Sequence, residues 1–335
     1  MSRPGQPTIL DVARMAGVSR ATVSRYLNGH RWVSADSAAK IKEAIERTHY
    51  VANAHARALV TGRGGSVAFL LGEPQHLLFE DPNFATLLQS VADELGKRGQ
   101  SFLLMTANGE EERRRDISFL KAGHVDGVIQ VAWHRNSKDL IDELVEANIP
   151  TVIAERPADD TLPVGYVHVE DYGSARKACE YLHSRGAGKI AMIAGPDGPS
   201  GTRDRVHGFL DVEGEDARDR IVYGDYSSRS GEIGMKALLE QCSDIDAVFI
   251  SSDAMAVGAM KVLRSNGIRV PEDMQIIGFD DSSAAMLADP PLTTIKQPFD
   301  EIGRYLVTLL NQIIDGGKSV GVTLPCELIK RGTTL

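Results

Sequence analysis

Two short amphipathic segments joined by a tight turn constrain this chain more than any other feature. They occupy residues 8–29, TILDVARMAGVSRATVSRYLNG. Thr8 can cap the first segment by accepting a backbone N–H, and Asp11 completes a capping box three residues later. Gly17 supplies the positive φ that ends this helix, and Ser19 can cap the second one. The pattern is typical of a helix-turn-helix whose second helix enters a DNA major groove, although an ordinary helical hairpin shares its apolar spacing.

The second segment has an apolar side and a polar side. Val23 and Leu27 are spaced to point inward. The opposite face carries small and basic side chains, namely Arg20, Ala21, Ser24, Arg25 and Asn28. At a major groove an arginine can hydrogen-bond guanine O6 and N7 together, whereas serine and threonine suit phosphate. This face is therefore the candidate DNA-reading surface.

Charge is distributed unevenly along the chain. Residues 1–63 contain ten Lys or Arg and four Asp or Glu, a net charge of +6. The whole chain has 37 basic and 46 acidic residues, so residues 64–335 carry a net charge of −15. Phosphate would be repelled by the acidic part, and nucleic acid should contact only the basic head. The asymmetry favours two units with separate partners.

Length and composition limit the class of protein. The chain has 335 residues, 42% of them hydrophobic, which is enough for more than one core. No apolar run approaches the roughly 18 residues needed to span a bilayer, and the start, MSRPGQPT, lacks the apolar core of a signal peptide. The three cysteines, Cys179, Cys242 and Cys326, include no CxxC pair. We expect a cytoplasmic protein with buried thiols, no membrane partner, no cofactor and no metal site.

The head continues with a third predicted helix and a linker. Ser34 can cap a helix in which Ala38, Ile41 and Ile45 form the apolar stripe. Asn53 can cap a further helix that ends near residue 60, too short to be stable alone in water. Residues 61–65, TGRGG, have a linker's composition. We therefore predict a helix-turn-helix head at 1–50, a hinge helix and linker at 51–65, and a core at 66–335.

The core alternates apolar β-rich runs with amphipathic helical stretches. The predicted strands are 67–71, 101–105, 127–131, 151–155, 166–170, 189–195, 247–252 and 274–280. Helical patterns lie between most of them, for example at 84–98, 174–184, 233–241 and 254–266. Such near-continuous apolar strands indicate parallel sheets covered on both faces, with ligands bound beyond the carboxyl ends of the strands. The fold class is α/β, with two similar halves and a cleft between them.

Several motifs occur in order along the chain, namely DVARMAGVSRATVSRYLNG, NAHARAL, RVHGF at 205–209, ISSDAMAVGAMKVLRSNGIRVPEDMQIIGFDD at 250–281, PPLTTIKQP at 290–298 and LPCELIKRGTTL at the end. With these motifs the chain resembles the LacI/GalR family of bacterial transcription regulators over essentially its whole length. The resemblance implies a three-helix DNA head, a hinge helix and a core shaped like periplasmic sugar-binding proteins. In such a core the chain passes between the two subdomains three times. We place one subdomain at 66–162 plus 293–324 and the other at 163–292 plus 325–335.

The resemblance also implies the residues that contact DNA. Arg20, Ala21 and Arg25 match base-reading positions, and Leu59 matches a hinge leucine that wedges into the minor groove. Ala52 replaces the proline that is common before Asn53, so the start of the hinge helix is less rigidly set. The complete candidate set is Thr8, Ser19, Arg20, Ala21, Thr22, Ser24, Arg25, Asn28, Asn53, Ala56, Arg57 and Leu59.

The implied effector site lies in the cleft. Arg205 and Asp280 match the effector-binding arginine and aspartate, and each can clamp two neighbouring sugar hydroxyls. The remaining matches are Asp253, Gln297, Tyr226, which could stack on a sugar ring, and, more weakly, Glu155. Ser252 stands where the family commonly has Asn, and Asp281 is expected to be a cap or ion-pair partner. Aromatic residues that could line the mouth, although a core position is more typical of them, are Phe79, Phe84 and Trp133.

An enzymatic core is the main alternative. A glycosidase needs a pair of carboxyl groups, which could come from among Asp253, Asp280 and Glu155. However, GxSxG, GxGxxG, P-loop and HExxH motifs are absent, and His168, His183 and His207 form no ligand set. A sugar-binding protein outside the cytoplasm would fit the core but not the basic head.

We therefore expect a regulator without catalytic residues. A homodimer would bind a near-palindromic double-stranded operator, and a small molecule in the cleft would change its DNA affinity. A sugar is the expected effector, with a purine or sugar phosphate as the alternative, and inducer and corepressor both remain open. A strand-like segment after Arg331 without a heptad repeat favours a dimer over a tetramer.

Overall fold

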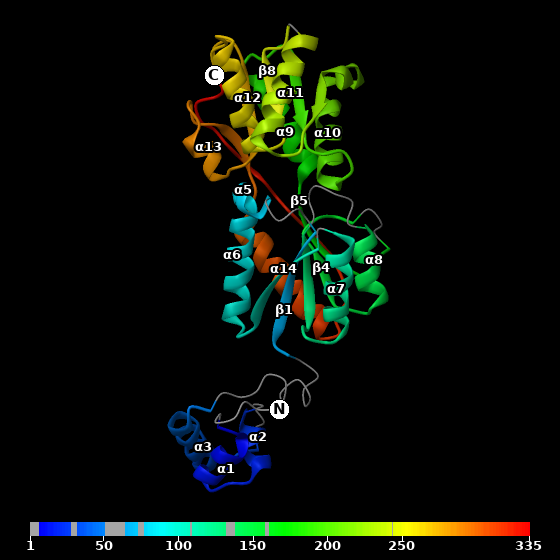
Figure 1. Cartoon of the computed structure of the whole chain (residues 1–335). Helices are drawn as coiled ribbons and strands as arrows, with labels where there is room; N and C mark the ends of the chain where they lie inside the picture. Colours follow the sequence, from blue (N-terminus) through cyan, green and yellow to red (C-terminus); the bar gives the residue numbers. More distant parts are fainter. Residues whose placement is uncertain are drawn as a thin grey trace. The chain divides into compact units, whose positions relative to one another are not determined.

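In a computed structural model, the chain separates at Gly65 into two units, residues 1–65 and 66–335 (Figure 1). The structure describes residues 7–27, 32–50, 64–72, 77–107, 109–131, 138–157, 161–242 and 244–335. Among the helices in these ranges, none combines the length and hydrophobicity needed to cross a bilayer.

The head is built from three helices around a small core. They are α1 (Ile9–Ala16), α2 (Arg20–Leu27) and α3 (Ala35–Thr48). The predicted capping box is present, since the Asp11 carboxylate accepts the Thr8 backbone N–H at 2.9 Å and the Thr8 hydroxyl at 2.7 Å. Gly17 ends α1 with a φ of 65°, as predicted. The buried residues are Val12, Ala13, Ala16, Val23, Ile41 and Ala44, whereas Val18 and Ile45 are only half-buried.

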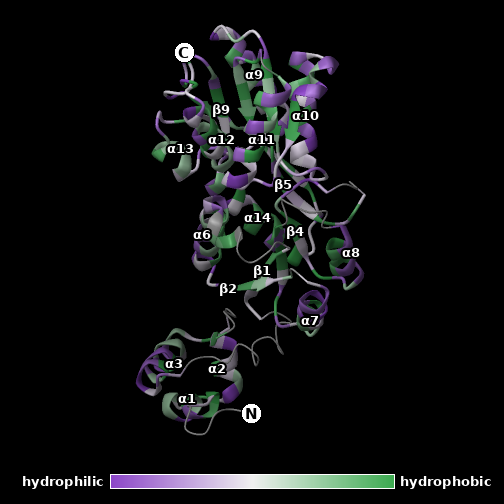
Figure 2. Cartoon of the chain, turned by 45° about the horizontal axis from the view of Figure 1, so that its top comes forward, coloured by the Kyte–Doolittle hydropathy of each residue, from purple (hydrophilic) through white to green (hydrophobic). Residues whose placement is uncertain are grey.

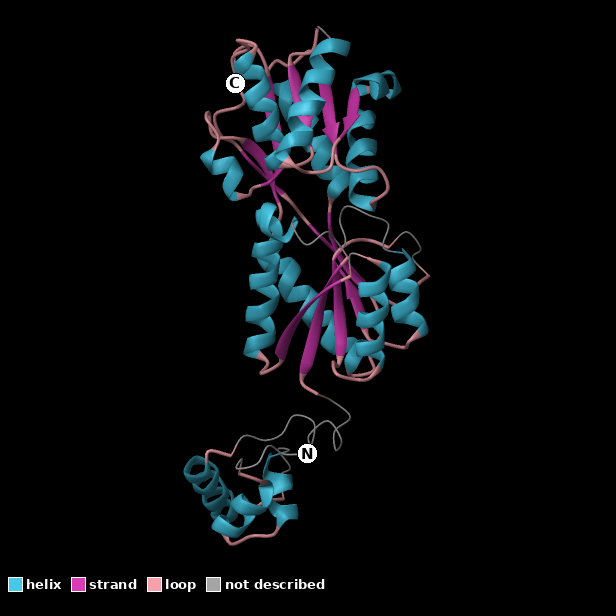
Figure 3. Ribbon diagram, viewed as in Figure 1, coloured by secondary structure: helices cyan, strands magenta, loops and turns pink. Residues whose placement is uncertain are grey.

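The first lobe of the core contains a six-stranded sheet in the order β11-β5-β4-β3-β1-β2, with all pairs parallel. Its strands are β1 (Ser66–Leu71), β2 (Ser101–Thr106), β3 (Gly127–Val131), β4 (Thr151–Ile153), β5 (Gly165–Val169) and β11 (Gly321–Leu324). Its helices are α5 (Leu77–Glu80), α6 (Pro82–Lys97), α7 (Glu110–Lys121), α8 (Lys138–Glu146) and α14 (Phe299–Ile314). Because side chains alternate along β1, Phe69 packs with α6 and α14 and Leu70 packs with α7 and α8 (Figure 3).

The second lobe repeats this arrangement with the order β12-β10-β9-β8-β6-β7. Its strands are β6 (Ile190–Ala194), β7 (Ile221–Tyr223), β8 (Ala247–Ile250), β9 (Gln275–Asp280), β10 (Thr293–Lys296) and β12 (Glu327–Ile329). The helices are α9 (Asp171–Ser184), α10 (Ser200–Glu213), α11 (Ser228–Gln241), α12 (Asp253–Ser265), α13 (Ser283–Leu287) and the 3-10 helix η1 (Glu215–Arg220). Helices α9 and α10 cover one face of the sheet, and α11 and α12 cover the other. Figure 2 shows apolar strands between helices whose outer faces are polar.

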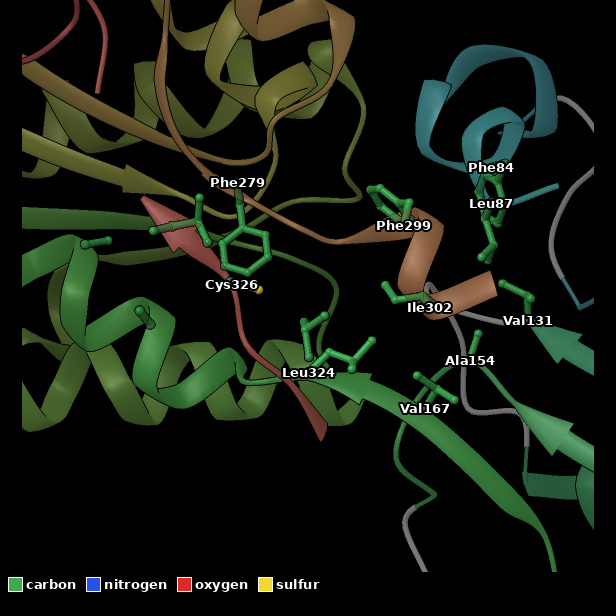
Figure 4. Close-up of a cluster of buried hydrophobic side chains, with 14 of the residues drawn as sticks. Phe84, Leu87, Val131, Ala154, Val167, Phe279, Phe299, Ile302, Leu324 and Cys326 are labelled. Carbon is green, nitrogen blue, oxygen red and sulfur yellow. The ribbon is translucent and has the colours of Figure 1, made fainter. Parts of the chain in front are cut away.

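The chain crosses between the lobes three times, after β5, after β10 and between β11 and β12. The predicted subdomain limits at 162/163 and 292/293 are therefore displaced, because β5 pairs in the first sheet and β10 in the second. An apolar cluster continues across these crossings, from Phe84 and Val167 through Leu324 to Phe279 and Cys326 (Figure 4). The two lobes consequently share part of one core.

Three further expectations are wrong, at least in part. The sheets are not wholly parallel, since β12 runs antiparallel to β10. The terminal strand lies before Arg331, at Glu327–Ile329, rather than after it. Cys179 and Cys326 are buried as expected, but Cys242 is partly exposed.

Candidate functional site

The outer face of α2 is the first candidate site. Arg20, Ala21 and Arg25 are exposed and Ser24 is half-buried, while Val23 on the opposite side is fully buried. Neither Arg20 nor Arg25 forms an ion pair with any residue that the structure describes. Within the described part of the chain, helix α2 thus presents two guanidinium groups whose hydrogen-bond donors are available to a partner.

The hydroxyl groups near this face have local roles as well. Ser19 Oγ caps α2 by accepting the Thr22 N–H at 3.1 Å, and it lies 2.9 Å from Thr22 Oγ1. Thr8 is engaged with Asp11 as described above. The other predicted DNA contacts, Asn28, Asn53, Ala56, Arg57 and Leu59, lie outside the described residues.

The second candidate site is a cleft between the lobes, with about 790 Å³ of space between its lining atoms, a volume that includes some open solvent. Residues at or just beyond the carboxyl ends of strands contribute much of its wall, as expected for parallel sheets. Of the predicted effector residues, the cleft brings together Arg205, Asp280, Tyr226, Gln297 and Glu155.

Arg205 on α10 is held rigidly at the cleft wall. Its Nε donates to Asp171 Oδ1 at 2.7 Å, and its Nη1 donates to the Ser251 carbonyl at 2.8 Å. The guanidinium carbon lies 3.6 Å from the ring centroid of Phe279. Burial alone would lower the pKa of Arg205, but the charge of Asp171 raises it above its ordinary value. Arg205 is therefore a fixed cation.

Asp280 ends β9 and links the two lobes. Its Oδ2 accepts Asn83 Nδ2 from the first lobe at 2.9 Å, and its Oδ1 accepts Gln297 Nε2 at 2.7 Å. Its φ of 117° is unfavourable for a residue with a side chain and persists only where the surroundings hold it. Burial and then the charge of Asp253 raise the pKa of Asp280 well above its usual range. The next residue, Asp281, pairs with Arg331, as the sequence led us to expect.

Asp253 does not reach the cleft, in contrast to the sequence prediction. Its carboxylate is fully buried behind the wall, where Oδ2 accepts the Ser282 N–H at 2.7 Å and Oδ1 accepts the Thr294 hydroxyl at 2.5 Å. Burial raises the pKa of Asp253 to about 7. Because both oxygens are engaged, Asp253 anchors the turn after Asp280 to β10 rather than contacting a ligand.

Glu155 lies on the other side of the cleft in a second bridge between the lobes. Its Oε1 accepts the Ser200 hydroxyl and, at 3.2 Å, the Gly201 N–H. The neighbouring Arg156 reinforces the bridge with two bonds to the Asp204 carboxylate at 2.7 and 2.9 Å. Burial, followed by the charge of Asp171, raises the pKa of Glu155 to about 7.

Tyr226 is the predicted aromatic that lines the cleft. Its hydroxyl lies 3.0 Å from Thr202 Oγ1, and burial raises its pKa to about 12. The ring lies against Gly195, where an added Cβ would come within 2.2 Å of the Tyr226 hydroxyl oxygen, so this packing requires glycine. Phe79 is instead 84% exposed, Phe84 belongs to the buried core, and Trp133 lies outside the described residues. Phe299, which the sequence did not suggest, lines the cleft.

Comparison with known proteins finds matches for both the head and the core. Residues 8–53 match the family described as bacterial regulatory proteins, lacI family, and residues 179–334 match a periplasmic binding protein-like domain. The HTH-type transcriptional regulator CelR of Thermobifida fusca is 38% identical over 332 residues, 98% of this chain and 97% of that protein. The chain belongs to the LacI family.

Solved structures of the family match over nearly the whole chain. A CelR–cellobiose complex gives a TM-score of 0.77 at 35% identity, covering 98% of this chain and 99% of the other. A lac repressor dimer bound to operator and the anti-inducer ONPF gives a TM-score of 0.82 at 27% identity, with the same coverage. The relatives are transcriptional regulators, so this member of the LacI family is a regulator and not an enzyme.

Five polar residues that line the cleft were not predicted from the sequence, namely Asp81, Asn83, Asp171, Ser251 and Ser282. Ser251 directly follows β8 and Asp171 lies two residues after β5, so the rule that ligands bind beyond strand ends would have identified them. Asn83 gave no such signal, because it begins a helix of the other lobe. His168 also lines the cleft, and its Nε2 lies 2.8 Å from Thr323 Oγ1.

Proposed function

We propose that this protein is a cytoplasmic, homodimeric repressor that binds a near-palindromic operator and responds to a carbohydrate in the cleft. The observation that carries the proposal is the pairing of two chemistries in one chain. An exposed face on the head carries two arginines without an ion pair to any described residue, and a cleft lined by fixed hydrogen-bonding groups lies in the core.

The chemistry of the cleft supports a neutral sugar. Arg205 and Asp280 offer a donor fork and a carboxylate that suit vicinal hydroxyls, and Tyr226 offers an aromatic ring beside them. A relative in this family was solved with cellobiose. Among the described residues, four carboxyl groups line the same cleft as one arginine, those of Asp81, Glu155, Asp171 and Asp280. The charge of Arg205 is already paired with Asp171, so a phosphate would find acidic groups and no free cation there, and this disfavours a sugar phosphate.

The chemistry of the head supports recognition of base sequence. Arg20 and Arg25 are free to contact guanine, and Ala21 has only a methyl group to place against thymine. Ser19 at the cap of this helix, and Thr22 and Ser24 within it, suit phosphate oxygens. Two heads related by a dimer axis would contact two half-sites, and this makes the operator near-palindromic. The relative bound to operator is itself a dimer.

Regulation would follow from the way the lobes are connected. Asn83–Asp280 and Ser200–Glu155 bridge the lobes on either side of the cleft, so a ligand there must exchange bonds with both. A change in lobe spacing would pass through β1 to the linker and the hinge. Such coupling is typically about 1–3 kcal/mol and reciprocal, so effector and operator change each other's affinity by the same factor.

The test starts with selection of an operator from a pool of random duplexes by the full-length protein. Fluorescence anisotropy then measures affinity for the selected duplex with cellobiose, ribose, adenine or glucose 6-phosphate present. We expect base-sequence-dependent binding that a neutral sugar changes and glucose 6-phosphate does not. Binding indifferent to base order would refute the regulator, and a response only to glucose 6-phosphate or adenine would refute the sugar assignment.

Two further measurements test the assembly. Analytical ultracentrifugation should give a mass near two subunits, and a mass near four would contradict the dimer. Leu59→Ala should weaken operator binding by more than about tenfold, because the wedge that unstacks the central base step is lost. Its effector affinity should be unchanged, and unaltered operator affinity would refute the hinge role.

A further inference from the structure

The side-chain hydroxyl of Ser251 is buried in the cleft wall without a role in the contacts described above. This serine directly follows β8, is fully buried and contributes to the cleft wall. Its Oγ has no hydrogen-bond partner among the residues that the structure describes. A buried hydroxyl without a partner is uncommon in a folded protein and costs stability.

The backbone of Ser251 is fixed on both sides. Its N–H donates to the Ile193 carbonyl at 2.9 Å, and its own carbonyl accepts Arg205 Nη1 at 2.8 Å. The direction of the Cα–Cβ bond is therefore set, and the hydroxyl can move only by rotation about this bond. Continuing the alternation along β8 puts Ser251 on the side of Phe249, which contacts the Phe279 ring on which Arg205 lies.

The adjacent serine shows what a structural hydroxyl looks like at this place. Ser252 Oγ accepts the Met255 N–H at 3.2 Å and caps α12, and it also reaches the Tyr226 carbonyl at 3.4 Å. The fold therefore uses the Ser252 hydroxyl both as an acceptor and as a donor. The contrast between neighbouring serines indicates that the Ser251 hydroxyl has a different role.

We propose that Ser251 contacts the effector, and that its hydroxyl selects ligands that present a hydrogen-bonding group beside the Arg205 guanidinium. This inference rests on the proposed carbohydrate effector and names one of its specificity determinants. A sugar hydroxyl at this position gives Ser251 the partner that the protein withholds. A site that depends on such a bond discriminates strongly against a ligand that lacks the group.

Ser251→Ala should weaken sugar binding without lowering the stability of the ligand-free protein. The substitution removes an unpartnered hydroxyl, so the ligand-free protein should unfold at the same or a higher urea concentration than wild type. Its dissociation constant for cellobiose, or for whichever sugar of the panel binds wild type best, should rise about tenfold. A hydroxyl that served the fold alone would give the opposite pair of results.

Thr333→Val is the matched control. Thr333 is also fully buried in the second lobe, but its hydroxyl donates to the Ile276 carbonyl at 2.7 Å and accepts the Thr293 N–H at 2.9 Å. This variant should unfold at lower urea and keep wild-type sugar affinity. Isothermal titration calorimetry and urea unfolding of the full-length proteins supply both readouts.

Monodeoxy analogues of the bound sugar identify the bond itself. One analogue should bind wild type more weakly than the parent sugar does, yet bind Ser251→Ala as well as the parent does, because the contact is already lost. Unchanged sugar affinity in Ser251→Ala, or a loss of ligand-free stability, would overturn the role of Ser251 alone. If wild type binds no sugar of the panel, the carbohydrate assignment fails and this inference fails with it.

Discussion

The head and the cleft both depend on arginine, but they use it in opposite ways. Arg20 and Arg25 project from α2 without an ion pair to any described residue, whereas Arg205 is only 7% exposed and bonded to Asp171. An exposed, hydrated guanidinium can approach a polyanion at little cost and displace its counterions. A buried guanidinium keeps one position because its partners have already oriented it. The surroundings of an arginine, rather than its charge, therefore decide whether it suits DNA or a small neutral ligand.

The acidic groups extend the same contrast. The head's carboxylates form exposed pairs within one helix, such as Asp36–Lys40 at 2.7 Å. The cleft's carboxylates are instead gathered around one cation, and burial raises the pKa of Glu155 and Asp280. The head therefore offers positive charge to solvent, and the core conceals an excess of acid.

Removing the buried arginine should produce the largest effect. Arg205→Met leaves the Asp171 carboxylate buried without its partner, and such losses are typically about 3–5 kcal/mol of unfolding free energy. Urea unfolding of the full-length protein measures the change. Arg205→Met combined with Asp171→Leu should recover much of it, because no isolated charge remains. A loss below about 1 kcal/mol in the single variant would show that the pair is not a buried support.

Removing either exposed arginine should affect DNA and leave the fold intact. Arg20→Ala or Arg25→Ala should weaken binding to the selected operator by about 1–3 kcal/mol, or roughly 5- to 150-fold. Unfolding free energy should change by no more than about 0.5 kcal/mol, as for other surface substitutions. Anisotropy with operator and scrambled duplexes separates the roles. An equal loss on both duplexes, with a salt slope reduced by about 1, would mean that the arginine contacts phosphate only.

The raised pKa of Glu155 predicts how core stability depends on pH. A carboxyl group with a higher pKa in the folded protein holds its proton more tightly there. Its stabilising contribution is complete below about pH 4.5 and is lost as the pH rises to about 7. Glu155→Gln keeps an uncharged acceptor for Ser200. Between these pH values the free energy of unfolding of the variant should fall by about 1 kcal/mol less than that of wild type, after allowance for solvent screening. Glu180→Gln, at an exposed carboxylate, is the control.

For the Glu155 variant, urea unfolding at several pH values is the measurement. Asp253 and Asp280 retain their own raised pKa values, so a shallower slope of stability against pH is expected rather than a flat one. A slope equal to that of wild type would show that the Glu155 carboxyl is solvated. Such a result would weaken the contrast between the exposed acids of the head and those of the cleft.

The head could be predicted closely because its determinants are local. Capping by Asp11 and Ser19, the positive φ of Gly17 and the inward spacing of Val23 all depend on residues within four positions of one another. The strands β7, β10, β11 and β12 were missed because each has only three or four residues and is defined by its partner strand.

The cleft could be predicted in part because its geometry is not local. The residue types and family motifs indicated Arg205, Asp280 and Glu155, yet motif position alone could not show that Asp253 is enclosed by Thr294 and Ser282. The bond from Asn83 to Asp280 joins residues 197 positions apart and leaves no pattern in the sequence. Whether a polar residue faces the ligand or supports the wall is decided by such contacts.

Removing the cap of α2 should give the smallest effect, confined to the head. Ser19→Ala removes the oxygen that accepts the Thr22 N–H, and loss of an N-cap typically costs about 1 kcal/mol. Amide hydrogen exchange of α2 in the full-length protein should accelerate by roughly fivefold, and peptides from the cleft should be unaffected. Ser24→Ala, on the same helix, should leave exchange unchanged, since Ser24 lies within α2 rather than at its cap. If both variants accelerate exchange equally, the stability of α2 depends on its overall polarity. If exchange in the cleft changes as well, the head and the core do not respond as separate units.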